Sequence, residues 1–111
     1  VHGIRNCDTV RKAIRFLELR ETPYRFVDLA AAGVAAEQVP RWVEQVGWEV
    51  LLNRRGLTWR RLSEAERTDL DRNRARALLI SHPTLIKRPV VDWGDALTVG
   101  FDPDDWTRRL A

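Results

Sequence analysis

The residue with the clearest capacity for chemistry is Cys7, the single cysteine among 111 residues. Directly after it, apolar residues recur at helical spacing: Val10, Ala13, Ile14 and Leu17. A helix N-terminus offers unpaired amide groups and the positive end of the helix dipole, so it favours the thiolate, the nucleophilic form of cysteine. The pattern therefore predicts a nucleophilic thiol at the entrance of a helix.

Charged neighbours act on this thiol in opposite directions. Arg5 and Arg11 add positive charge that favours the anion, whereas the Asp8 carboxylate disfavours it. We expect Asp8 or Thr9 to supply the side-chain oxygen that caps the helix. The alternative is an inert thiol, since free cysteines commonly pack as small hydrophobic residues. The polar residues on either side of Cys7 argue against a hydrophobic pocket.

Composition restricts the class of protein. With 111 residues and 44% hydrophobic content, the chain can form one domain that buries about two-thirds of its unfolded surface. One cysteine excludes an internal disulfide, and no apolar run reaches membrane-spanning length, which together predict a cytoplasmic protein without a membrane partner. Because the sequence lacks methionine, we expect its native start to precede Val1.

The numbers of charged and of metal-ligating residues restrict the molecules that the chain could bind. The 19 Lys and Arg residues are spread among 16 acids, giving a net charge of +3. This spread fits an anion-binding pocket better than a nucleic-acid surface, so nucleic acid is the least favoured partner. One cysteine and the two distant histidines, His2 and His82, predict no metal site.

The elements that must position Cys7 follow from periodicity and turn residues. Residues 1–4 predict an inner strand, residues 9–20 a helix ended before Pro23, and residues 24–29 a second strand parallel to the first. From residue 30 to about 83 the pattern is helical, with stops at Gly47 and at the polar run 53–56. Within this segment, Ser63 matches a capping box and Asp71 a helix cap.

The C-terminal part returns to strands. Residues 85–92 predict a strand, residues 93–95 a turn, and residues 96–99 its antiparallel partner. Asp102 is the expected N-cap of a closing helix with Pro103 as its first residue. The resulting order is β-α-β, helices, β-β-α, the layout of an α/β, thioredoxin-like domain with a small mixed sheet and a helical insertion.

Four sequence blocks carry a family resemblance: GIRNCDTVRKA (3–13), WEVLLNRRGLTWRRL (48–62), HPTLIKRPVV (82–91) and VGF (99–101). Together they resemble the arsenate reductase-like ArsC/Spx family, closest to its YffB branch, and the match covers nearly the whole chain. The resemblance implies a single domain over 1–111. Residues 1–29 and 84–111 would form the thioredoxin-like core, and residues from about 30 to 83 the helical insertion.

The resemblance also assigns roles around Cys7. It implies that Cys7 attacks an oxyanion or a disulfide, that Arg88 faces it, and that the Arg88-Pro89 bond is cis. Physical chemistry agrees, since a residue before proline is held extended and a guanidinium presents a planar fork to oxyanions. The alternative is an ordinary solvated pair formed by Lys87 and Arg88.

Further binding residues are assigned with less support from the pattern. We expect Asn6, Arg11, Arg54 and Pro89 to bind substrate or glutathione. The register around Arg54 is ambiguous, so Asn53 or Arg55 is an alternative counterpart of the family's anion-binding arginine. The resemblance implies a third anion-binding arginine late in the final hairpin. In this chain the corresponding residues, 98–101, read Thr-Val-Gly-Phe and contain no arginine. This replacement argues against arsenate, since each charge-assisted contact is worth about 1.5–3 kcal/mol.

A single thiol requires an external reductant. We expect no bound cofactor and a reaction in which glutathione, as co-substrate, resolves a mixed disulfide or oxyanion adduct on Cys7, with glutaredoxin as a candidate partner. The sequence thus predicts a glutathione-dependent monothiol oxidoreductase. The alternative is an Spx-like regulatory protein that binds RNA polymerase without catalysis. Position 10 is Val10, so the C-x-x-C switch of Spx-type regulators is absent.

Overall fold

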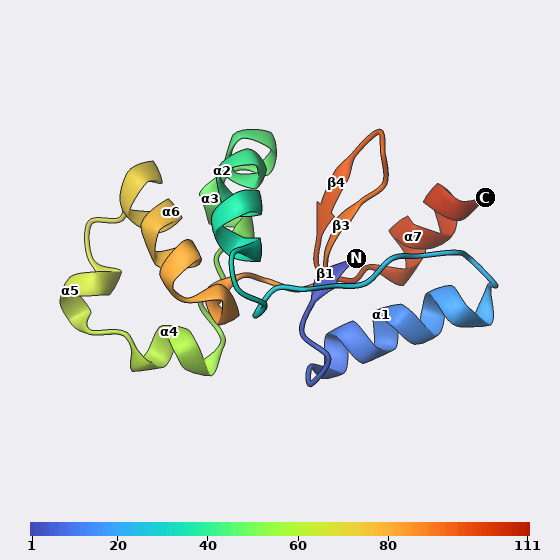
Figure 1. Ribbon diagram of the computed structural model, residues 1–111, viewed down its shortest axis with the longest axis horizontal. Helices are drawn as coiled ribbons and strands as arrows, with labels where there is room; N and C mark the ends of the chain where they lie inside the picture. Colours follow the sequence, from blue (N-terminus) through green and yellow to red (C-terminus); the bar gives the residue numbers. More distant parts are fainter. The chain divides into compact units, whose positions relative to one another are not determined.

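The computed structural model describes residues 1–111, shown in Figure 1. Its elements are β1 (His2–Gly3), α1 (Asp8–Leu19), β2 (Val27–Asp28), α2 (Val34–Val46), α3 (Trp48–Leu51), α4 (Leu57–Arg61), α5 (Glu64–Arg67), α6 (Arg72–Ser81), the 3₁₀ helix η1 (Pro83–Leu85), β3 (Val90–Asp92), β4 (Leu97–Val99) and α7 (Pro103–Leu110). The chain divides into two compact units. The first is Val1–Asp28 with Arg88–Ala111, and the second is Leu29–Lys87.

The first unit is built on a mixed four-stranded sheet in the order β2-β1-β3-β4. β1 runs parallel to β2, with His2 opposite Val27, and antiparallel to β3, with His2 opposite Val90. β3 and β4 form an antiparallel hairpin. This topology confirms the predicted α/β, thioredoxin-like fold. His2 is buried in β1, an inner strand of this sheet, as the inner strand predicted for residues 1–4 requires.

Helix α1 carries the predicted apolar stripe toward the sheet. Val10, Ala13 and Leu17 are buried, while Ile14 is half-buried. The first turn of this helix lies unusually close to β1, because a Cβ atom added to Gly3 would stand 2.8 Å from Val10 Cγ2. Glycine at this position therefore permits the close approach of helix and strand.

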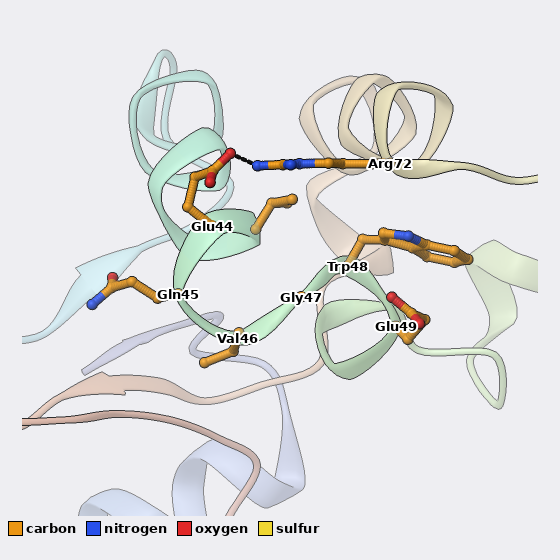
Figure 2. A pocket seen from close by; sticks show the side chains of 8 residues that line it. Glu44, Gln45, Val46, Gly47, Trp48, Glu49 and Arg72 are labelled. Atoms are coloured by element: carbon orange, nitrogen blue, oxygen red, sulfur yellow. Dashed lines mark ion pairs between the residues drawn. The ribbon is translucent and has the colours of Figure 1, made fainter.

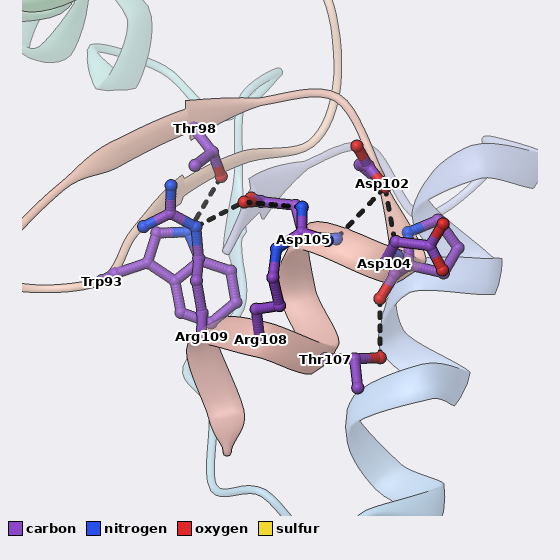
Figure 3. A network of polar contacts seen from close by, with 9 residues as sticks. Trp93, Thr98, Asp102, Asp104, Asp105, Thr107, Arg108 and Arg109 are labelled. Atoms are coloured by element: carbon purple, nitrogen blue, oxygen red, sulfur yellow. Dashed lines mark hydrogen bonds and ion pairs between the residues drawn. The ribbon is translucent and has the colours of Figure 1, made fainter.

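Helix α7 begins as predicted. The Asp102 carboxylate accepts hydrogen bonds from the backbone N–H groups of Asp104 and Asp105, at 3.1 and 3.2 Å, and Pro103 occupies the first turn. Figure 3 shows this cap together with the Asp105–Arg109 pair one turn later, at 2.8 Å. The acids near the N-terminus of this helix and the arginines near its C-terminus both interact favourably with the helix dipole.

Helices α1 and α7 lie on the same side of the sheet (Figure 1) and enclose an aromatic core. Trp106 of α7 is 1% exposed and makes edge-to-face contacts with three other rings, at centroid distances of 4.8 to 5.9 Å. These rings are Phe16, Trp93 and Phe101. The cluster joins α1, α7 and the β3–β4 hairpin.

The second unit is helical, with α2 packed against α6. Trp42 and Val43 of α2 and Ala75 and Leu79 of α6 are buried. Pro40 lies inside α2, where it supplies no N–H group for the helical ladder. Gly47 ends this helix with φ of 87°, as the sequence predicted. No helix in either unit combines the length and apolar character needed to cross a membrane.

The predicted strands are shorter in the structure. Of residues 24–29 only Val27–Asp28 form a strand, and of residues 85–92 only Val90–Asp92. Residues 85–92 were predicted as a strand, but Pro83–Leu85 forms η1 and the regular strand begins only at Val90. The Ile86 N–H donates to the Pro83 carbonyl at 3.1 Å, which keeps this segment turned. Proline at position 89 has no N–H group, so ladder pairing starts after it.

The capping box at α5 is confirmed and makes a stability prediction. Ser63 Oγ accepts from the Glu66 N–H at 3.1 Å, and the Glu66 carboxylate accepts from the Ser63 N–H at 2.9 Å. We expect Ser63→Ala to lower the free energy of unfolding by about 1 kcal/mol. Urea denaturation measures this loss, with the exposed Ser81→Ala, outside any cap bond, as control. An unchanged midpoint for Ser63→Ala would contradict the prediction.

Candidate active site

Cys7 is the N-cap residue of α1, with extended backbone angles of φ −138° and ψ 124°. Its side chain is half-buried and its thiol is free. The expectation that Asp8 or Thr9 caps the helix is wrong, because helical geometry already begins at Asp8. The cysteine itself therefore occupies the position from which a side chain faces the free N–H groups of the first turn.

Arg88 is brought to Cys7 by the start of β3. The Arg88-Pro89 bond is cis, as the family resemblance implied, and the Pro89 side chain is fully buried. The Pro89 carbonyl accepts a hydrogen bond from the Gly100 N–H at 2.8 Å, which ties this segment to the end of β4. From this position the Arg88 guanidinium hydrogen-bonds the Cys7 sulfur.

The surroundings of Cys7 lower the pKa of its thiol. Partial burial acts to raise that pKa. The backbone N–H of Val10, the hydrogen bond and charge of Arg88, and the backbone N–H of Thr9 together outweigh burial, so the pKa falls below its ordinary value. The two backbone donors were not identified as individual functional groups from the sequence, although a helix entrance after Cys7 implied such amides.

This depressed pKa predicts a pH dependence. The rate at which iodoacetamide alkylates Cys7 should rise with pH. Its midpoint should lie below that of the urea-unfolded chain, where a free thiol has a pKa of about 8.5. Arg88→Met removes a cation and a donor, so we expect its midpoint to move upward, since burial still acts against the thiolate. Arg108→Met, which removes an exposed cation of the same unit, should leave the midpoint unchanged.

The lowered pKa of Cys7 also determines how this thiol changes the stability of the fold with pH. Because the thiol binds its proton less tightly in the folded chain, its stabilising contribution is complete above the unfolded pKa and is lost as pH falls through the folded pKa. An alkylation midpoint equal to that of the unfolded chain, or unchanged in Arg88→Met, would contradict the assigned contacts.

Arg11 and Asn6, predicted to bind ligand, lie together on the cysteine loop. The Arg11 guanidinium donates to Asn6 Oδ1 at 2.8 Å and to Asp8 Oδ1 at 2.9 Å. These bonds brace the loop around Cys7, and the Arg11 charge offsets the Asp8 carboxylate next to the thiol. Binding of a ligand by these two residues remains a prediction.

Arg54 belongs to the second unit, where its guanidinium lies 5.6 Å from the centre of the Trp59 ring. Asn53, an alternative anion ligand, uses Oδ1 to accept the Arg55 N–H at 3.0 Å, so its carbonyl oxygen holds the local turn. Asn53, Arg54 and Arg55 all line a groove of about 260 Å³. A role for Arg54 toward the Cys7 substrate remains a prediction.

The end of the hairpin shows what replaces the third family arginine. Thr98 Oγ1 accepts the indole N–H of Trp93 at 2.8 Å (Figure 3), and the Gly100 N–H is bonded to Pro89. Residues 98–101 therefore contribute structural hydrogen bonds and no cation. Nowhere in the structure do three His, Cys, Asp or Glu side chains gather as a ligand set for a metal ion.

Comparison with known proteins gives a consistent assignment. The model of the ArsC family matches residues 2–108. An uncharacterised protein of Haemophilus influenzae is 35% identical over 111 residues, which are 100% of this chain and 97% of that protein. The solved structure of a YffB protein has a TM-score of 0.92 at 42% identity, covering 99% of this chain and 96% of its own. An arsenate reductase (ArsC) related protein from Brucella melitensis has a TM-score of 0.78 at 41% identity, covering 96% and 89%.

Proposed function

Because this chain belongs to the ArsC family, we propose that it is a glutathione-dependent monothiol oxidoreductase with Cys7 as its nucleophile. The observation that carries the proposal is the environment of the sulfur. A half-buried thiol faces the N–H groups of a helix entrance and the Arg88 guanidinium, and its pKa is lowered. Such surroundings distinguish reactive cysteines from structural ones.

The proposed reaction consists of thiol–disulfide exchanges. The Cys7 thiolate attacks one sulfur of a disulfide substrate, forming a mixed disulfide and releasing the other half as a thiolate. A glutathione thiolate then attacks the substrate-derived sulfur, which regenerates the Cys7 thiolate and forms a glutathione–substrate disulfide. Each exchange forms one S–S bond and breaks one, so the reducing electrons come from glutathione.

An oxyanion substrate follows a longer course. Condensation with the Cys7 thiolate releases water and forms a sulfur–oxyanion adduct. One glutathione attacks the Cys7 sulfur, which releases the reduced oxyanion and leaves a Cys7–glutathione disulfide; a second glutathione, with glutaredoxin as the candidate catalyst, returns the thiolate. The absence of a cation at residues 98–101 favours a disulfide over arsenate as the substrate.

The thiol count and the expected cytoplasmic location support glutathione as the co-substrate. With a single cysteine the chain cannot resolve its own mixed disulfide, so an external thiol is required. Glutathione is the abundant small thiol of a reducing cytoplasm, where a protein without disulfides is stable. The Arg88 guanidinium beside the sulfur, and Arg11 on the same loop as Cys7, suit the carboxylates of this tripeptide.

Mass spectrometry after exposure to glutathione disulfide tests the proposal. We expect one glutathione adduct, on the peptide that contains Cys7, forming faster in the folded chain than in urea and reversed by reduced glutathione. The comparison is made below the ordinary cysteine pKa, where only a stabilised thiolate reacts rapidly. A folded chain without the adduct, combined with stable capture of RNA polymerase, would instead support the regulatory alternative.

A further inference from the structure

The second unit carries a groove lined by charges of both signs, and we propose that it binds the zwitterionic amino-acid end of a glutathione-type thiol, with Glu49 recognising the ammonium group. The groove has a volume of about 260 Å³ and is lined by Glu49, Leu52, Asn53, Arg54, Arg55 and Lys87. The choice of glutathione rests on the proposed function. The recognition itself rests on the charges of this groove.

Backbone pairing holds three of the residues that line the groove, Leu52, Asn53 and Lys87. Leu52 and Ile86 form an antiparallel bridge, flanked by hydrogen bonds from the Asn53 N–H to the Leu85 carbonyl at 2.8 Å and from the Lys87 N–H to the Leu51 carbonyl at 2.7 Å. Leu52 and Ile86 are 3% and 0% exposed. Two backbone segments distant in sequence are thereby fixed side by side. Lys87 lies opposite Leu51 in this pairing, and the segment that pairs through Leu52 and Asn53 continues into Arg54 and Arg55.

The charged groups of this groove are available to a ligand. The side chains of Arg55 and Lys87 are exposed and form no ion pair within the chain, and Arg54 rests against Trp59. Glu49 also has no cationic partner. The adjoining groove, which Glu49 also lines, differs in this respect, because there Glu44 is paired with Arg72 (Figure 2).

The combination of charges selects a ligand class. Three cations and one carboxylate line the groove, so a compact oxyanion would meet the like charge of Glu49 as well as the cations. An amino-acid end places an ammonium beside a carboxylate and satisfies both signs, and glutathione adds a second carboxylate. Complete pockets for drug-sized ligands measure about 300–1,000 Å³, so this groove is sized for one end of the tripeptide.

The test uses S-methylglutathione, which cannot exchange disulfides, and its N-acetyl derivative, which lacks the ammonium. We expect Glu49→Gln to weaken binding of S-methylglutathione by about threefold to fivefold, the scale of an exposed ion pair. The original chain should bind the N-acetyl ligand more weakly than S-methylglutathione, by the same factor. The Glu49→Gln variant should bind both ligands with the same affinity, as a double-mutant cycle requires when Glu49 contacts the ammonium. NMR titration gives the affinities and shows whether groove residues shift.

Glu64→Gln is the matched control, because it removes one exposed carboxylate of the same unit outside both grooves. It should bind both ligands as the original chain does. No binding of S-methylglutathione, shifts confined to other residues, or equal losses for both ligands in Glu49→Gln would overturn the proposal. Glutathione adducts on Cys7, measured separately, show whether the proposed function stands when the groove proposal fails.

Discussion

Cys7→Ser is expected to abolish thiol–disulfide turnover, leaving only the rate of glutathione with substrate in solution. A serine hydroxyl remains protonated at neutral pH and forms no disulfide, and the chain contains no other cysteine that could substitute for it. Turnover is measured as the thiol released from a small disulfide substrate. This is the largest effect we expect on activity.

The same variant carries its own folding control. Serine is a favourable N-cap residue, so Cys7→Ser should preserve α1 and the free energy of unfolding, which circular dichroism and urea denaturation test. Loss of turnover with an intact fold would then be chemical in origin. Turnover retained above the solution rate would exclude Cys7 as the nucleophile.

Trp106→Ala is expected to cause the largest loss of stability, about 3–5 kcal/mol, because it empties the centre of the aromatic core. Small domains are stable by about 5–15 kcal/mol, so the variant should unfold at much lower urea concentration. The control is Trp59→Ala, which removes a half-buried indole of the second unit and should cost less. A loss below about 1 kcal/mol for Trp106→Ala would contradict the described packing.

Local rules predicted much of this fold correctly. The apolar stripe of α1, the capping box at Ser63 and the caps at Asp71 and Asp102 each depend on a few neighbouring residues, and all are confirmed. The parallel pairing of the first two strands followed from the chirality and length of the connection between them.

Features that depend on distant residues were predicted less well. Ile86 is apolar and strand-like in sequence, but it pairs with Leu52 in an isolated bridge rather than extending β3. Asp8 is a favourable capping residue, yet its carboxylate bonds Arg11 and helical geometry starts one residue earlier than capping by Asp8 requires. Tertiary contacts decide between such local options, and the sequence pattern alone does not reveal them.

The same limit applies to the candidate site. Cys7 and Arg88 were paired through family resemblance, since nothing in their 81-residue separation indicates contact. The donors that act on the sulfur beside Arg88 are backbone amides of Thr9 and Val10, and any residue other than proline supplies an amide. The residue types at positions 9 and 10 therefore do not identify these amides as functional. Only the position of the helix start does so.

The close approach of Gly3 to Val10 links the sheet directly to the reactivity of the sulfur. A larger residue at position 3 would clash with the Val10 side chain, so that side chain or the first turn of α1 has to shift. Where the turn shifts, the amides of Thr9 and Val10 move with it. The acidity of the Cys7 thiol thus depends on Gly3, four residues upstream, which contributes no side chain and lets the helix lie close to the strand.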